Sequence, residues 1–278
     1  AVAIAEHIGG SVEKFAILMN NKAKEIGCTD THFVTPNGLD GEDEGGIHHT
    51  TARDLGLIMA YAVKNTTFVH ITQTRNYTFS DISGKKYYFV HNTNAFLDME
   101  TGVISGKTGF TGNAGYCYVC AVRQDEKFFI VALLGCGWPG NKNYKWSDAK
   151  KLLAYGRNNY RYVMLPDLPV LPDIPVSDAV PKNGELYPDA QITLKLHAAV
   201  SSKDLAKRYL LKKSESITWE ADLPEKLEAP VKKNQKIGSL HAKLDGKEIF
   251  CCLVTAEDKI GRITYKWYAD KIFHDYFH

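Results

Sequence analysis

The sequence lacks a hydrophobic run long enough to cross a membrane. Its longest nearly apolar stretch, Phe128–Trp138, is far shorter than the roughly 18 residues that a spanning helix needs. It also lacks an excess of charge of one sign, because 34 basic and 32 acidic side chains give a net charge of +2 over 278 residues. We therefore expect neither a membrane-spanning protein nor a nucleic-acid partner.

The N-terminus lacks a helix cap. Ile4, Ala5 and Ile8 recur at helical spacing, yet no Ser, Thr, Asp or Asn precedes them. We expect the sequence to begin inside this helix, after its first residues, which would make the chain a fragment or give it an engineered start. A natural, frayed terminus is the alternative.

The first part of the chain, residues 1–163, mixes helices and strands. A helix is predicted over residues 12–26, with Ser11 as its cap and Gly27 as its end. Thr51 is predicted to cap the next helix, and Asp54 to favour its positive start. Predicted hairpins and a last helix follow, at residues 77–80 with 86–90, 115–123 with 127–134, and from the cap Ser147 to about residue 160.

One strand of this region has an unusual composition. Residues 128–134 are apolar on both faces, which is typical of a central strand covered by helices on both sides of the sheet. We therefore expect an α+β domain whose antiparallel sheet is flanked by helices.

Four prolines within residues 165–175 predict an extended connector. Beyond it, short alternating runs predict a small β-rich domain over residues 164–262. The tail, residues 263–278, has a helical stripe of Tyr265, Tyr268, Ile272, Phe273 and Tyr276. Such a stripe indicates either a membrane-surface helix or a helix packed on its own domain.

Lys107-Thr108-Gly109 stands directly before the strand at residues 115–123, with Gly106 and Gly112 around it. A lysine and a threonine there can hold a carboxylate by charge and by a hydroxyl hydrogen bond. Glycine leaves the backbone open to a ligand. The pattern favours a carboxylate-binding site, and a Lys-Thr-Gly triplet is one mark of covalent serine enzymes.

Several further stretches, in order, make the resemblance specific. They are residues 18–27 (LMNNKAKEIG), 31–40 (THFVTPNGLD), 50–55 (TTARDL), 92–94 (NTN) and 106–111 (GKTGFT). With them the chain resembles the serine-type D-alanyl-D-alanine carboxypeptidases, which are low-molecular-mass penicillin-binding proteins. The likeness covers residues 1 to about 160, and implies part of a β-lactamase/transpeptidase-like domain. The β-rich remainder resembles the C-terminal domain of that family.

The resemblance implies an enzyme that removes the terminal D-Ala from peptidoglycan stem peptides through a serine acyl-enzyme. Lys107 and Thr108 would hold the substrate carboxylate, and Lys107 would also support proton transfer. Gly109 would keep the strand edge clear, Phe110 would supply an oxyanion N–H, and Asn37 would lie near the site. No cofactor is implied. β-Lactams would inhibit the enzyme, and the location would be the bacterial cell envelope, peripheral on the outer face of the cytoplasmic membrane through the tail.

The nucleophile is the missing part of the pattern. Ser-x-x-Lys occurs at Ser11, Ser83 and Ser147, but each serine has a structural explanation as a helix cap or a turn residue. In the family, the Ser-x-x-Lys and Ser-x-Asn motifs both precede the helix that begins this chain. We therefore expect the nucleophile to lie upstream, and this chain not to be acylated. The alternatives are a non-catalytic wall-binding relative and a serine β-lactamase.

The cysteines and histidines suggest no metal site. Cys117 and Cys120 are three apart on a strand and so face opposite sides, and Cys251 and Cys252 also diverge. His48 is followed by another histidine, but no third ligand has a fitting spacing. We expect free thiols and no metal.

Overall fold

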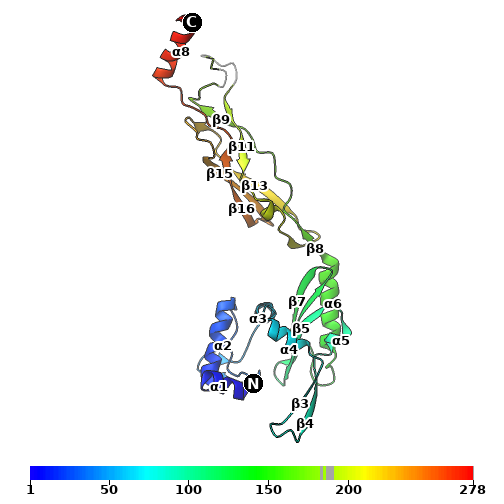
Figure 1. The fold of residues 1–278 in the computed structure, drawn as a ribbon. Coiled ribbons are helices and arrows are strands. Elements are labelled where there is room, and N and C mark those ends of the chain that lie inside the picture. The colour runs from blue at the N-terminus through cyan, green and yellow to red at the C-terminus, as the bar shows by residue number, and fades with distance from the viewer. Residues whose placement is uncertain (182–183, 186–190, 278) are drawn as a thin grey trace. The chain divides into compact units, whose positions relative to one another are not determined.

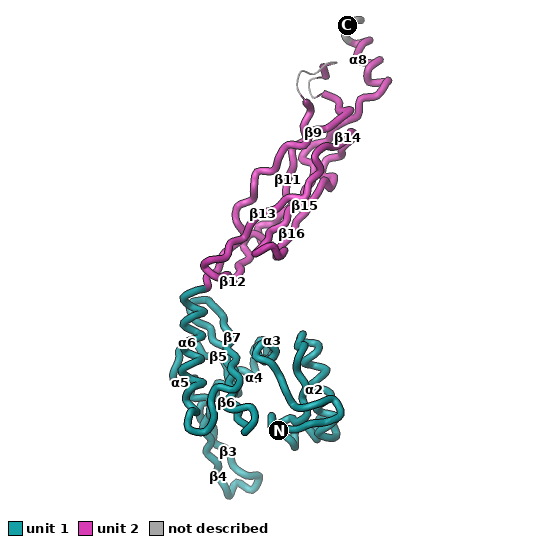
Figure 2. The backbone as a smooth tube through the Cα atoms, turned by 180° about the vertical axis from the view of Figure 1, so that it is seen from behind, with its two compact units in different colours: residues 1–159 teal, residues 160–278 magenta. Residues whose placement is uncertain are grey.

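The computed structural model describes residues 1–181, 184–185 and 191–277. Within these ranges it describes side chains up to residue 274, so the Tyr276 side chain of the predicted stripe lies outside the described part. The chain forms two compact units, Ala1–Asn159 and Tyr160–His278 (Figures 1 and 2). The division falls shortly before the boundary expected after residue 163, because Tyr160–Val163 forms strand β8. This strand pairs with β12 (Tyr209–Lys212) of the second unit.

Two helices begin the first unit, α1 (Val2–Gly9) and α2 (Val12–Ile26). Ser11 caps α2, since its Oγ accepts a hydrogen bond from the Lys14 N–H at 3.2 Å. Gly27 ends the helix with φ of 94°, in the left-handed region. Both sequence-based assignments are confirmed, because a cap and a C-terminal glycine act within a single turn.

The next segment is a loop with a two-residue ladder, β1 (Glu42–Asp43) and β2 (Gly46–Ile47), followed by α3 (Ala52–Ala62). Thr51 caps α3 as predicted, accepting from the Asp54 N–H at 3.1 Å. The Asp54 carboxylate does more than favour the helix start. It is buried and accepts hydrogen bonds from the N–H groups of Thr29 and Asp30, at 3.0 and 2.8 Å.

An antiparallel sheet in the order β5-β6-β7 organises the rest of the unit (β5 Val103–Thr111, β6 Gly115–Gln124, β7 Lys127–Leu133). Helix α6 (Tyr144–Asn159) covers one face, where its Trp146 and Leu153 pack with Phe96 of α5 (Phe96–Met99). Alternate residues of β6 complete this core: Tyr118, Cys120 and Val122. Helices α3 and α4 (Thr66–Gln73) cover the other face, around Met59, Phe68, Val119 and Ala121. The expected antiparallel sheet flanked by helices is confirmed.

One local prediction is confirmed and another is wrong. Helices α3 and α6 cover the two faces of β7, as its apolar run predicts, and among the described residues β7 pairs with β6 alone. Ser147 does not cap α6. The helix begins at Tyr144, and the Ser147 hydroxyl donates to the Tyr144 carbonyl at 3.0 Å.

The predicted hairpin at residues 77–90 is confirmed as β3 (Asn76–Ser80) and β4 (Tyr87–His91). It projects from the first unit in both views (Figures 1 and 2). Its aromatic side chains are largely exposed and stack on one another, as Phe79 and Tyr88 do with ring centroids 5.0 Å apart.

The second unit is β-rich, as predicted. One sheet has the order β11-β16-β15-β13, from Leu196–Ala198, Lys247–Ala256, Lys236–Leu244 and Ile217–Asp222. A smaller sheet has the order β10-β9-β14, from Thr193–Leu194, Ile174–Ser177 and Leu227–Glu228. The described residues of this unit also form helices α7 (Ser202–Leu205) and α8 (Tyr265–Phe277). Within the described part of the chain, no helix has the length and apolar character of a membrane span.

Strand β5 passes close to a buried polar pair. Asn94 accepts a hydrogen bond from the Tyr118 hydroxyl at 2.8 Å, and burial raises the pKa of that hydroxyl, which therefore remains a donor. A Cβ at Gly106 would lie 2.5 Å from Asn94 Nδ2 and 2.8 Å from Tyr118 Oη, whereas a Cβ at Gly109 would meet nothing nearer than Cys117 Cβ at 3.9 Å. Packing therefore requires glycine at position 106 but not at position 109.

Alanine at these two glycines should have opposite consequences for stability. We expect Gly106→Ala to lower the free energy of unfolding by about 1–3 kcal/mol, because the added methyl overpacks the Asn94–Tyr118 pair. Gly109→Ala should change it by less than about 0.5 kcal/mol. Urea unfolding of the two variants measures the difference, and equal stability would contradict the packing argument.

Candidate functional site

A cavity of about 500 Å³ in the first unit brings the Lys-Thr-Gly segment together with the loop before α3. Lys107, Thr108, Gly109 and Phe110 all line it. Asn37 does not; its side chain accepts a hydrogen bond from the Leu39 N–H at 3.1 Å and so stabilises the turn. Other lining residues include Phe33, Gly38, Asp40, His48, Thr50, Leu55, Asn113 and Cys117.

The orientation of the β5 backbone follows from its register. Phe110 lies opposite Tyr116, whose N–H donates to Gly137 O at 2.8 Å and whose carbonyl accepts from the Cys136 N–H at 2.7 Å. Both backbone groups of Tyr116 thus point away from β5, so this is a non-hydrogen-bonded pair of the antiparallel ladder. The N–H and C=O of Phe110 therefore point to the outer edge of β5, as do those of Thr108 two residues earlier.

The side chains at this edge supply charge and a hydroxyl. Lys107 is exposed, and its ammonium donates to the Thr108 carbonyl. It carries the one ammonium among the described residues that line the cavity. The Thr108 hydroxyl lies 3.3 Å from that of Thr93. An ammonium, hydroxyls and outward N–H groups on one strand edge form an arrangement that can bind a carboxylate and polarise a carbonyl beside it.

An aromatic stack closes one end of this edge. The ring of Phe110 lies over Tyr116 with centroids 4.5 Å apart, and the Lys145 ammonium lies 4.5 Å from the Tyr116 centroid. Lys145 is buried beside Trp146, and this burial lowers its pKa. Its ammonium contacts these rings and also donates to the Lys142 carbonyl. Lys145 does not line the cavity, so Lys107 is its ammonium.

The opposite wall depends on a neutral histidine. His48 Nδ1 accepts hydrogen bonds from the N–H groups of Val34 and Thr35, at 3.0 and 3.3 Å, so this nitrogen carries no proton. Partial burial lowers the pKa of His48, in agreement with that role. A bridge from Asn113 Nδ2 to Asp40 Oδ2, 3.1 Å long, links this loop to the turn that follows β5.

Sequence reasoning did not assign Cys117 to the cavity. Its signal was present, since Cys117 lies opposite Gly109 once β5 and β6 are paired through the turn at residues 112–114. The predicted divergence of the cysteines on β6 is confirmed, because Cys120 is fully buried in the core on the other face. All six thiols are free.

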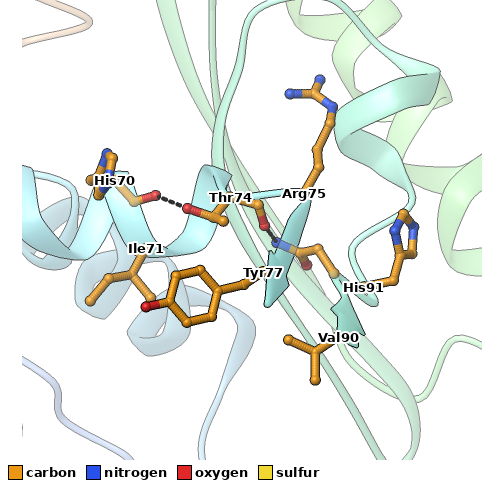
Figure 3. Close-up of a pocket in the computed structure, with 8 residues that line it drawn as sticks. His70, Ile71, Thr74, Arg75, Tyr77, Val90 and His91 are labelled. Carbon is orange, nitrogen blue, oxygen red and sulfur yellow. Dashed lines mark hydrogen bonds between the residues drawn. The ribbon is translucent and has the colours of Figure 1, made fainter. Parts of the chain in front are cut away.

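A second groove lies between the end of α4 and the β3–β4 hairpin (Figure 3). Its walls include Ile71, Tyr77 and Val90, and the Arg75 side chain extends away from the Tyr77 ring. Arg75 already donates to Asp98 Oδ1 at 2.5 Å and to the Leu97 carbonyl at 2.9 Å. Since its cation is engaged elsewhere, this groove presents a mainly apolar surface and is a weaker candidate than the Lys107 cavity.

The His48 contacts should make the first unit sensitive to mild acid. A lowered pKa in the folded state means that the unfolded state binds more protons, so stability is present above the ordinary histidine pKa of 6.5 and is lost as the pH falls below it. Between pH 7.5 and 5.5 we expect the melting temperature of the unaltered chain to fall by roughly 2–4 °C more than that of His48→Gln. Thermal unfolding at the two pH values measures this, and parallel losses in both proteins would contradict it.

Comparison with known proteins gives a family match in each of the two units. The D-alanyl-D-alanine carboxypeptidase family profile matches residues 1–137, and the profile described as penicillin-binding protein 5, C-terminal domain, matches residues 195–262. The two matches fall in the first and second units respectively, in the order that the sequence predicted.

Individual relatives give the same result. The chain is 28% identical over 269 residues to D-alanyl-D-alanine carboxypeptidase DacF of Bacillus subtilis, covering 95% of this chain and 64% of the relative. It is 30% identical over 256 residues to DacA of Escherichia coli K12, covering 89% and 56%. The chain thus spans less than two thirds of these curated relatives. The crystal structure of penicillin binding protein 5 from Haemophilus influenzae superposes with a TM-score of 0.56 at 27% identity, covering 94% of this chain and 70% of that one. By its two domains, its motifs and its relatives, the chain is related to the D-alanyl-D-alanine carboxypeptidases.

Proposed function

We propose that this chain provides the carboxylate-binding edge of a serine-type D-alanyl-D-alanine carboxypeptidase. The reaction would remove the terminal D-Ala from a peptidoglycan stem peptide through a serine acyl-enzyme. The observation that carries the proposal is the outer edge of β5, where the Lys107 ammonium, the Thr108 hydroxyl and the Phe110 N–H border one cavity.

Each group has a distinct role in this proposal. Lys107 and Thr108 bind the terminal carboxylate, and Lys107 also supports the proton network around the nucleophile. The Phe110 N–H donates to the oxyanion that forms when the penultimate carbonyl is attacked. Packing does not require glycine at position 109, so the lack of a side chain there leaves the outer edge of β5 open to the substrate. Asn37 contributes through its turn, which carries Gly38 to the cavity wall.

We do not assign the acylated serine to Ser11. Its Oγ accepts the Lys14 N–H and so satisfies the first turn of α2. Of the other two Ser-x-x-Lys matches, Ser83 donates to Asp81 Oδ2 at 2.7 Å within a turn, and Ser147 donates to the Tyr144 carbonyl. All three serines therefore have structural roles.

The proposed partners and location follow from the same reaction. Stem peptides would be the substrate and β-lactams the inhibitors, and the protein would act outside the cytoplasm in the cell envelope. We propose that α8 lies on the outer face of the cytoplasmic membrane, because Tyr265, Tyr268 and Ile272 are exposed on a short helix that also carries basic residues.

A non-catalytic wall-binding relative would use the same carboxylate site and differ only in lacking turnover. A serine β-lactamase is less well supported, because the second unit matches a penicillin-binding protein domain.

The carboxylate site can be tested by binding. We expect a short peptide ending in D-Ala-D-Ala to bind the chain, and Lys107→Met and Thr108→Val each to weaken it by roughly tenfold or more, since each removes a hydrogen bond to a charged group. Calorimetry measures the affinity. The same peptide with an amidated C-terminus should bind the unaltered chain no more tightly than the free-acid peptide binds Lys107→Met.

Two further measurements sharpen this test. Lys85→Met removes an exposed lysine of the β3–β4 turn and should leave the peptide affinity unchanged. If Lys85→Met lowered the affinity as much as Lys107→Met, the loss would come from the net charge of the chain and not from the carboxylate site. Intact mass after incubation with a penicillin should show no adduct on Ser11. An adduct mapped to that serine would overturn the structural role that we give it.

The position of α8 can be tested with vesicles. We expect the chain to sediment with anionic phospholipid vesicles. The double variant Tyr268→Ser, Ile272→Ser should bind the vesicles at least roughly tenfold more weakly, because it removes apolar side chains that would enter the interface. Tyr87→Ser, which alters an exposed aromatic residue of the β3–β4 hairpin, is the matched control. Equal sedimentation of all three proteins would contradict the proposal.

A further inference from the structure

The second unit carries a row of polar side chains across one face of its four-stranded sheet. Glu220 on β13 lies opposite His241 on β15, which in turn lies opposite Cys251 on β16. Cys251 is exposed and His241 about three-quarters buried, while the residues that follow them, Ala242 and Cys252, are buried on the other face. The row therefore faces away from the core of this sheet.

A β-bulge adds a carboxylate to this row. Ala242 pairs with Phe250, but the next pair is Lys243 with Glu248, so Ile249 is an extra residue on β16. Strict alternation would place Glu248, three residues before Cys251, on the opposite face. The bulge returns it to the outer face, which is a known way for a sheet to redirect a side chain.

These side chains converge. One ligand atom each from His241, Glu248 and Cys251 can be chosen so that all three lie within 4.8 Å of one another, and this is the one such group among the residues that the structure describes. His241 Nδ1 lies 2.6 Å from Glu248 Oε2, and its Nε2 lies 2.8 Å from Ser239 Oγ. The ring is therefore held at both nitrogens, with one nitrogen turned to the carboxylate.

We propose that His241, Glu248 and Cys251 bind a divalent transition-metal ion of the zinc class, with water as the fourth ligand. Imidazole nitrogen, carboxylate oxygen and thiolate sulfur are the ligands that zinc takes in proteins, at roughly 2.0–2.3 Å. Tetrahedral bonds of that length place neighbouring ligand atoms about 3.3 Å or more apart. The His241–Glu248 contact would thus lengthen by less than about 1 Å when the metal enters.

Charge and outer contacts fit this ion. A thiolate and a carboxylate offset its two positive charges, and the imidazole binds neutral, so entry of the metal releases the proton of the Cys251 thiol. With the metal on Nδ1, the ring proton of His241 would lie on Nε2, and the Ser239 hydroxyl, 2.8 Å away, would accept it. This is the outer contact that metal-bound histidines usually make. Lys243 is adjacent, but its ammonium pairs with Glu220 at 2.6 Å. The metal would cross-link β15 to β16 and restrain the bulge.

The test is zinc binding to the 278-residue chain by calorimetry. We expect one Zn²⁺ per chain, and at least roughly tenfold weaker binding to His241→Ala, Glu248→Gln and Cys251→Ser. Co²⁺ should produce a thiolate-to-cobalt absorption band in the near ultraviolet that Cys251→Ser abolishes. Ser239→Ala should weaken binding less than the loss of a ligand.

Two matched variants separate this site from general binding to histidines and thiols. His197→Ala removes an exposed histidine of β11 in the same sheet, and Cys252→Ser removes the adjacent, buried thiol. Both should keep the Zn²⁺ affinity and the Co²⁺ band, with circular dichroism confirming the fold of every variant. Absence of binding at about 1 mM Zn²⁺, or equal affinity of Cys251→Ser and Cys252→Ser, would overturn the proposal.

Discussion

The buried carboxylate of Asp54 is the interaction on which the wall of the Lys107 cavity depends. A charge removed from water must have its hydrogen bonds supplied by the protein. Here the N–H groups of Thr29 and Asp30 and the hydroxyl of Thr31 supply them, and the backbone bond from Asp30 is the main cause of the lowered pKa of Asp54. One side chain thus fixes the loop after α2 to the start of α3.

That anchor has consequences further along the chain. The bridge between His32 and His49 follows directly after the residues that Asp54 holds, and it sets His48 against the backbone of Val34. Leu55 of α3 and His48 of the loop both line the cavity. The electrostatics divide in the same way. The loop contributes the neutral imidazole of His48 and the Asp40 side chain, which pairs with Asn113, and β5 contributes the Lys107 ammonium.

What could be predicted from the sequence is what acts within a few residues. The caps at Ser11 and Thr51 and the hairpins needed only their own neighbours, and the Lys-Thr-Gly motif marked the strand that lines the cavity. The prediction that Ser147 caps α6 is wrong because the helix begins one turn earlier, and the N–H groups of Trp146 and Ser147 already donate to the Asn143 carbonyl. The apolar run of β7 showed that two helices cover it but not how many strands pair with it, because cover and pairing are independent constraints.

Register explains the remaining differences at both candidate sites. Phe110 presents its N–H outward because Tyr116 opposite it bonds to residues 136 and 137, and neither residue reveals this alone. Glu248 reaches the face of Cys251 only because the bulge inserts one residue between them. The sequence correctly predicts that the Cys251 and Cys252 thiols lie on opposite faces, but it does not show which residues of the neighbouring strand lie beside Cys251. A site built across strands depends on residues that alternation within one strand cannot bring together, so its chemistry becomes visible only when the pairing is known.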